Sequence, residues 1–266
     1  MKNPFRKTPK QPEMPVPRLK GNHRPHLTYL LIGTAIAVYI AEMTVLFTRG
    51  ADALEQVFGS FGFSAAAIGA GGWWTPFTSI FLHAGADHLL LNMIAMFFFG
   101  KVVEEELGSR KFALIFVTSA LAGDGAIMLS NLFGIMPANV PTIGMSAAIF
   151  GLMGAAMLAK PMEIVMHPYV IPMPLLLVAA VYVLYNVASF VAVMATGSGT
   201  DIAYPAHLGG IITGAYFGFR AVGRKKGLPI LLVLIAILAV VPFIWGMIEQ
   251  LQVFSWVNAL QQIMKG

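Results

Sequence analysis

Two side chains in this sequence have the chemistry of a nucleophile and its base. Ser146 lies among small residues in Gly144-Met145-Ser146-Ala147, where an apolar segment begins, and His207 lies near the start of another apolar segment. An imidazole that removes the proton of a serine hydroxyl turns it into a reactive nucleophile. We expect Ser146 and His207 to act together, which predicts hydrolysis at the depth of a membrane.

The composition is that of a membrane protein. Of the 266 residues 58% are hydrophobic and 11% are charged, and the mean hydropathy is +0.77. Soluble domains carry about a quarter charged residues. The absence of cysteine excludes disulfides and thiolate metal sites. The apolar segments lie at 27–48, 86–103, 111–133, 146–159, 170–193, 203–219 and 228–248. We predict an all-α membrane protein with a core of six transmembrane helices and one additional C-terminal transmembrane helix.

Basic residues predict the orientation. All Lys and Arg residues except Arg49 and Lys265 fall on the same side of this topology, and positive loops face the cytoplasm. The N-terminus is therefore expected in the cytoplasm and the C-terminus outside. The net charge of +5 is explained by this pattern, so no nucleic-acid partner is expected.

The remaining segments complete the predicted organisation. Residues 1–26 are basic and proline-rich and are expected to form a disordered cytoplasmic tail. Residues 49–85 are apolar, aromatic and broken by glycines, which favours a structured first loop in the outer membrane interface. Residues 223–248 are expected to form a cytoplasmic loop and the seventh helix, and 249–266 an external amphipathic tail.

Polar side chains of three segments are expected at one outer depth. His88 and Asn92 open the second helix, Ser146 the fourth and His207 the sixth. Polar groups at membrane depth are costly and are usually functional. His88 and Asn92 are four residues apart and share a helix face, so both can donate hydrogen bonds to an anion. With the free backbone N–H of Ser146 they form a candidate oxyanion hole.

The fourth predicted helix is short, and the sixth helix has small residues where the two are expected to pack. From Ser146 to Lys160 a helix rises about 21 Å, against a hydrocarbon core of about 30 Å. The preceding residues 137–144 hold two prolines, so we expect irregular backbone around a wet cavity. Gly210 and Gly214 form a GxxxG pattern that permits close packing of the fourth and sixth helices. Phe150, one turn after Ser146, could then pack on the ring of His207.

These residues together resemble the rhomboid family of intramembrane serine proteases. The matching features, in chain order, are Trp73-Trp74, the HxxxxHxxxN pattern of His83, His88 and Asn92, Glu104 with Gly108-Ser109-Arg110, Gly144-Met145-Ser146 with Phe150-Gly151, and Ala206-His207-Leu208-Gly209-Gly210 with Gly214. They extend over about residues 73–218, so 27–222 would be a six-helix rhomboid catalytic core.

The resemblance implies a role for each matching residue. Ser146 would be the nucleophile and His207 the general base of a dyad without a carboxylate. His88, Asn92 and the Ser146 N–H would form the oxyanion hole, and Phe150 would stack on His207. The supporting residues would be His83 in the first loop, Gly144, Gly210 and Gly214. The chain departs from the common family pattern at Ala147, Phe150 and Thr75, and the last puts first-loop anchoring in question.

Several polar residues also have simpler interpretations. Ser146 alone would be read as a helix cap, and Asn92 could join two helices. Asp124 is expected to be structural, although it could orient His207. Tyr185 and Asn186 could touch a substrate. A metal site of His83, His88 and His207 is rejected because no acidic ligand accompanies them, and no cofactor is expected.

The expected function is cleavage of single-span transmembrane proteins by an intramembrane serine endopeptidase. One alternative is a catalytically silent rhomboid-like protein that binds or escorts membrane clients. Another is a small-solute transporter, but paired broken helices in two repeated halves are not found. The expected location is a multi-pass position in the plasma membrane of a prokaryote. The sequence leaves the substrate, the oligomeric state and the role of the seventh helix open.

Overall fold

The computed structural model describes residues 23–166, 172–196 and 202–250, with side chains described up to residue 240. Most of the predicted cytoplasmic tail (1–26) and of the external tail (249–266) lies outside the described residues. Both therefore stay predictions.

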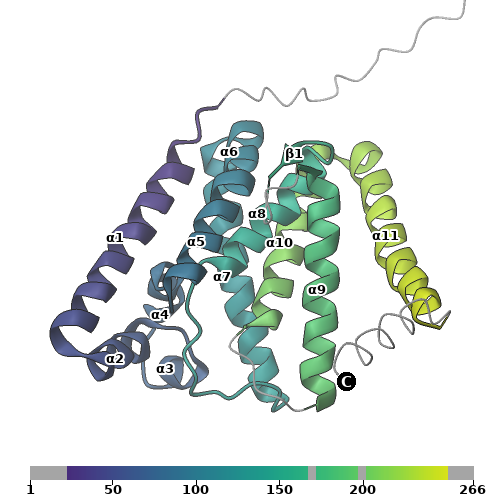
Figure 1. Cartoon of the computed structure of the whole chain (residues 1–266). Coiled ribbons are helices and arrows are strands. Elements are labelled where there is room, and N and C mark those ends of the chain that lie inside the picture. Colours follow the sequence, from purple (N-terminus) through teal and green to yellow (C-terminus); the bar gives the residue numbers. More distant parts are fainter. Residues whose placement is uncertain (1–22, 167–171, 197–201, 251–266) are drawn as a thin grey trace, which may run out of the picture.

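Long helices that alternate in direction form a bundle (Figure 1). They are α1 (His26–Arg49), a second helix built of α5 (Ala86–Ala95), the π-helical turn η2 (Met96–Gly100) and α6 (Lys101–Leu107), and then α7 (Ser109–Leu132), α8 (Ser146–Ala159), α9 (Leu175–Thr196), α10 (Tyr204–Val222) and α11 (Arg224–Gln250). Within the described residues, α1, α5–α6, α7 and α9 are long and apolar enough to cross a membrane, and α8 is a shorter apolar helix. The mostly helical membrane fold agrees with the sequence prediction, while the count of six spans plus one stays a prediction.

The first loop contains short helices packed at one end of the bundle. They are α2 (Ala51–Phe61), α3 (Ala65–Gly69), α4 (Thr75–Thr78) and the 3-10 turn η1 (Ser79–Phe81), all between α1 and α5 (Figure 1). Ser64 caps α3 by accepting a hydrogen bond from Ala67 N–H at 3.0 Å. Trp74 Nε1–H donates to Ser60 O at 3.0 Å, which fastens α4 to α2.

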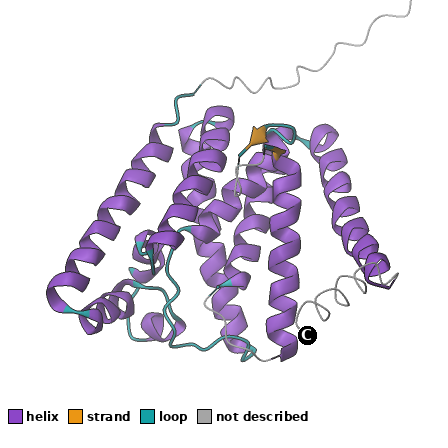
Figure 2. Ribbon diagram, in the orientation of Figure 1, coloured by secondary structure: helices purple, strands orange, loops and turns teal. Residues whose placement is uncertain are grey.

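The predicted start of the fifth helix is wrong. A span beginning at 170 was expected, but Met173–Pro174 forms strand β2, which pairs antiparallel with β1 (Ile164–Val165) (Figure 2). Helix α9 begins only at Leu175. Pro172 and Pro174 account for the difference, because proline lacks an N–H and moves the preceding residue away from helical angles.

Helix α8 is the centre of the bundle. Every residue from Ala148 to Leu158 is buried, and α8 packs most closely on α10 and then on α7. Glycines make this approach possible: a Cβ atom at Gly214 would overlap the carbonyl of Gly151, and one at Gly154 would lie 2.5 Å from Ile211 O. Small residues at helix crossings bring backbones together in this way. The backbones of α8 and α10 are therefore in direct contact.

A buried carboxylate joins the start of α1 to the α6–α7 junction. Glu104 is fully buried and accepts hydrogen bonds from Leu27 N–H, Thr28 N–H and the Thr28 hydroxyl at 2.8–3.0 Å. The Ser109 hydroxyl donates at 2.7 Å to Glu104 Oε1, the oxygen that also accepts from Leu27 N–H. The first N–H groups of a helix lack partners within it. Glu104 thus caps a helix 76 residues away in sequence.

The α8–α10 contact yields a stability prediction. Gly214→Ala should lower the free energy of unfolding by about 2 to 3 kcal/mol, because its new methyl group overlaps the backbone of α8. The matched control is Gly33→Ala on α1, where no heavy atom lies within 4 Å of the added Cβ. The control should be neutral or stabilising by up to about 1 kcal/mol. Equilibrium unfolding in mixed detergent micelles measures both, and equal effects would contradict the packing argument.

A second prediction concerns Glu104. Glu104→Ala should lower the free energy of unfolding by about 3 kcal/mol, because four donors lose a charged acceptor. Glu105→Ala should cost less than about 1 kcal/mol, since Glu105 only faces Lys101 across 4.0 Å at the surface. The same unfolding titration compares them. If Glu104→Ala lowers the free energy of unfolding no more than Glu105→Ala does, Glu104 does not act as a cap of α1.

Candidate active site

The first loop holds the segment that leads into Ser146. Phe63 and Thr142 form an isolated antiparallel bridge with N–H···O distances of 3.0 and 2.7 Å. Gly144 N–H then donates to Ser79 O at 2.8 Å. The backbone before Ser146 is irregular, as its prolines predicted, and it is bonded to protein. Ser146 is therefore the first residue of α8 at a fixed point of the bundle.

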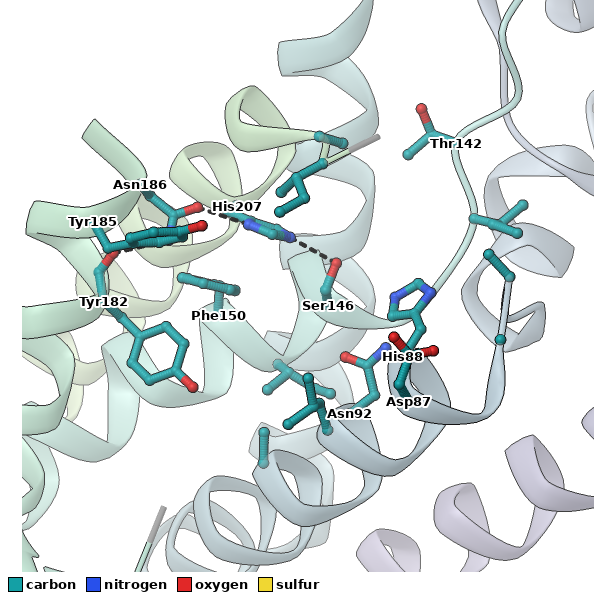
Figure 3. Close-up of a pocket in the computed structure, with 18 of the residues that line it drawn as sticks. Asp87, His88, Asn92, Thr142, Ser146, Phe150, Tyr182, Tyr185, Asn186 and His207 are labelled. Atoms are coloured by element: carbon teal, nitrogen blue, oxygen red, sulfur yellow. Dashed lines mark hydrogen bonds between the residues drawn. The ribbon is translucent and has the colours of Figure 1, made fainter. Parts of the chain in front are cut away.

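Ser146 and His207 are in hydrogen-bond contact. His207 Nε2 lies 2.8 Å from Ser146 Oγ, although 61 residues separate them in sequence (Figure 3). Gly210, one turn after His207, sits so close to α8 that a Cβ atom there would overlap the carbonyl of Ala147. The Phe150 ring stacks on the imidazole with centroids 4.2 Å apart and planes 8° apart. Two helices and one aromatic ring thus define the position of the imidazole.

The second ring nitrogen of His207 has a partner that sequence reasoning did not assign to it. Asn186 Oδ1 on α9 lies 2.7 Å from His207 Nδ1 (Figure 3). On the sequence alone, Asp124 is expected to be structural, with the orientation of His207 as its alternative role, and Asn186 is considered only as a residue that could touch a substrate. A lone Asn within an apolar helix was the only signal, because nothing in the sequence indicates which way α9 turns.

His88 and Asn92 lie across the cavity from His207, on α5 beside Ser146 (Figure 3). Gly144 adopts a φ of +108°, and a Cβ atom there would come within 2.7 Å of the His88 ring. Only glycine adopts such an angle easily and leaves room for that ring. Asn92 is 6% exposed, and its Nδ2 has no hydrogen-bond partner among the described residues. Its amide is thus free to donate to a group in the cavity.

His83 belongs to the first loop and is fully buried. Its Nδ1 lies 3.0 Å from Phe81 O, and its backbone N–H donates to the Glu42 carboxylate of α1 at 3.2 Å. The ring packs edge-on against His88, with centroids 5.1 Å apart. Burial, with a smaller effect of His88, lowers the pKa of His83 to about 4, so the ring is neutral at physiological pH. His83 supports His88 sterically.

A cavity of about 720 Å³ is lined by Ser146, His207, His88, Asn92 and Asn186, whereas His83 lies outside its lining. It reaches from the first-loop end of α5 across Ser146 to α9, and apolar side chains such as Ile149, Met153 and Tyr182 make up most of its wall. Asp87, next to His88, is the one carboxylate among the described lining residues. Across the described residues, no cluster of three His, Asp or Glu side chains is arranged to hold a metal ion.

The comparison with known proteins decides the family. The family model described as "Rhomboid domain" matches residues 70–224, which is more than half of the chain. The chain belongs to the rhomboid family. It is therefore an integral membrane protein of a family that includes proteases, and the matched region holds Ser146, His207, His88 and Asn92.

Individual relatives cover this rhomboid chain to different extents. It is 28% identical over 206 residues to "Rhomboid protease GluP" of Bacillus subtilis, covering 77% of this chain and 36% of GluP. It is 28% identical over 203 residues to "Rhomboid protease AarA" of Providencia stuartii, covering 71% of this chain and 70% of AarA. "Inactive RHOMBOID-like protein 8" of Arabidopsis thaliana is 34% identical over 87 residues, which cover 32% of this chain and 23% of that relative. The chain thus spans about a third of GluP, and the family contains proteins named as active and as inactive.

The departures from the family pattern have local partners. Thr75 is buried, and its hydroxyl donates to Gly72 O at 2.8 Å within the first loop. Ala147 faces α7, where a Cβ added to Gly123 would come within 2.7 Å of the Ala147 methyl. Phe150, which lacks a hydroxyl, keeps its ring face on His207.

Proposed function

We propose that this rhomboid protein is a serine endopeptidase that cleaves transmembrane protein substrates within the membrane. The observation that carries the proposal is the 2.8 Å distance between His207 Nε2 and Ser146 Oγ at the wall of a cavity. A general base must lie within hydrogen-bond reach of the proton that it removes. The names of GluP and AarA add support from the family.

Ser146 and His207 can carry out both halves of the reaction. Ser146 Oγ attacks the scissile carbonyl while His207 Nε2 takes the hydroxyl proton. The resulting imidazolium gives that proton to the leaving amine, the C–N bond breaks, and an acyl ester remains on Ser146. A water molecule then attacks the ester, His207 takes its proton, and the proton returns to Ser146 as the acid is released.

The negative charge that forms on the substrate oxygen has candidate donors. The backbone N–H of Ser146 is at the start of α8, where no intrahelical acceptor exists. The Asn92 amide lacks a partner among the described residues and lines the cavity beside His88. Donors of this kind, fixed before the reaction, stabilise the transition state more than the substrate. We assign the oxyanion hole to Ser146, His88 and Asn92.

The substrate class follows from the surroundings of the cavity. The cavity wall is mainly apolar, and α5, α8 and α9 are apolar helices of a membrane protein. A substrate that reaches Ser146 through lipid must itself lie in the membrane. A single transmembrane segment, unwound locally near Ser146, fits this requirement, since a regular helix buries its carbonyl groups in its own hydrogen bonds.

Labelling and cleavage together test the proposal. Purified protein in detergent or liposomes should react with a fluorophosphonate probe and should cleave a test substrate with a glycine-rich transmembrane segment. Both signals should be lost in Ser146→Ala and His207→Ala, while Thr118→Ala, whose hydroxyl bonds its own helix α7, should keep them. Cleavage by Ser146→Ala at the wild-type rate would end the proposal. Client binding without labelling in a folded sample would favour the silent binding protein.

A further prediction concerns the oxyanion hole. Asn92→Leu should lower kcat by about 100- to 1,000-fold with little change in KM, because the amide acts on charge that appears only in the transition state. Asn131→Leu is the matched control, since Asn131 at the end of α7 does not itself line the cavity and its amide donates to Met136 O and Pro137 O. An equal loss of kcat in both variants, or a loss confined to KM, would contradict the assignment of Asn92.

A further inference from the structure

We propose that Asn186 is a positioning residue that holds His207 in the tautomer and orientation needed to take the proton of Ser146. Its side chain is 2% exposed, and its Oδ1 lies 2.7 Å from His207 Nδ1. The inference rests on the proposed function. It adds to the dyad a third residue, supplied by α9.

The orientation of the Asn186 amide is determined by its other hydrogen bond. Nδ2 donates to Tyr182 O, one turn earlier on α9, at 2.8 Å. In the opposite orientation, Oδ1 would face that carbonyl oxygen, and two acceptors would repel each other. Oδ1 therefore faces His207 and can only accept. The proton of the neutral imidazole consequently lies on Nδ1.

This assignment leaves the correct nitrogen free. With its proton on Nδ1, the neutral ring of His207 presents an unprotonated Nε2 to Ser146, whose hydroxyl donates across 2.8 Å. When Nε2 takes the proton, the ring becomes positively charged and its hydrogen bond to Oδ1 becomes charge-assisted. Asn186 thus favours the reactive tautomer first and stabilises the imidazolium afterwards. No proton moves to Asn186.

Phe150 and Asn186 restrain the ring in complementary ways. Phe150 covers one face of the imidazole, with ring centroids 4.2 Å apart and ring planes 8° apart, and restricts the tilt of the imidazole. A stacked ring can still rotate within its own plane, and the two hydrogen bonds at Nδ1 and Nε2 remove that freedom. The neighbouring Tyr185 on α9 is exposed, whereas Asn186 is buried against His207.

The test uses three variants of Asn186 in the full chain. Asn186→Leu keeps the approximate volume and removes the acceptor, Asn186→Ala also removes the volume, and Asn186→Asp keeps an acceptor oxygen. We expect the Leu and Ala variants to lose about 10- to 100-fold in kcat with little change in KM, the effect of one hydrogen bond to a charged group. Asn186→Asp should recover most of that loss, because a buried carboxyl group that is protonated on the oxygen facing Tyr182 O donates there and still accepts from His207 Nδ1. Val183→Ala, a packing change one turn earlier on α9, should keep the wild-type kcat.

A second measurement reads the tautomer directly. In ¹⁵N-histidine-labelled protein, with the signal assigned by comparison with His207→Ala, His207 should carry its proton on Nδ1 in the wild type. Asn186→Leu should shift the ring toward a mixture of tautomers. This readout does not depend on turnover, and a thermal unfolding curve of each variant in detergent identifies any that is not folded.

The outcomes separate the two proposals. Cleavage by wild type no faster than by Ser146→Ala would overturn the proposed function, whatever the Asn186 variants do. Activity that needs Ser146 and His207 but has the wild-type kcat in Asn186→Leu would overturn the role of Asn186 alone. The same holds for an unchanged His207 tautomer in Asn186→Leu, and for a loss of kcat in Asn186→Asp that equals the loss in Asn186→Leu.

Discussion

The direct contact between the backbones of α8 and α10 is the constraint on which the candidate site depends. Ser146 and His207 lie at the same ends of these helices, and a serine–imidazole hydrogen bond tolerates only a few tenths of an ångström. Side chains of ordinary size at the crossing would separate the helices. Gly210 and Gly214, opposite Ala147 and Gly151, keep the two backbones together. The distance between Ser146 and His207 at one end of the helices therefore follows from packing along their length.

A second constraint is the fixed entry of the chain into α8. A short helix that begins with the candidate nucleophile Ser146 needs its N-terminus held by something other than its own hydrogen bonds. Here the first loop provides that support through the Phe63–Thr142 bridge and the bond from Gly144 to Ser79. His83 is tied to α1 by Glu42 and supports His88 from behind. The loop therefore connects α1 with both sides of the cavity.

Two buried polar residues, Glu104 and Asn92, have contrasting surroundings. Both carboxylate oxygens of Glu104 accept hydrogen bonds, as expected for a buried charge, which is costly when it is unpaired. Asn92 lines the cavity with an amide that lacks a partner among the described residues. Satisfied groups rigidify a fold, whereas an unsatisfied donor beside a cavity is available to a ligand. Glu104 is structural, and Asn92 suits a role in binding charge.

The sequence by itself determined the helical membrane fold and the family, and it singled out Ser146 and His207 as the candidate dyad. Hydrophobic length predicted the helices to within a few residues, because apolar side chains must match the thickness of a bilayer. Ser146 and His207 stood out because polar groups are rare in such helices. Pro172 and Pro174 oppose a helix that starts at 170, and α9 begins only at Leu175.

Only the tertiary structure decided which residue meets the second nitrogen of His207. Asp124 and Asn186 are both polar residues in apolar helices, and periodicity does not give the rotation of one helix against another. That rotation depends on the sum of many weak contacts among α8, α9 and α10. The result places Asn186 Oδ1 at 2.7 Å from His207. The sequence identified Ser146 and His207 as a pair. The fold adds Asn186 as a third residue, which the sequence did not identify.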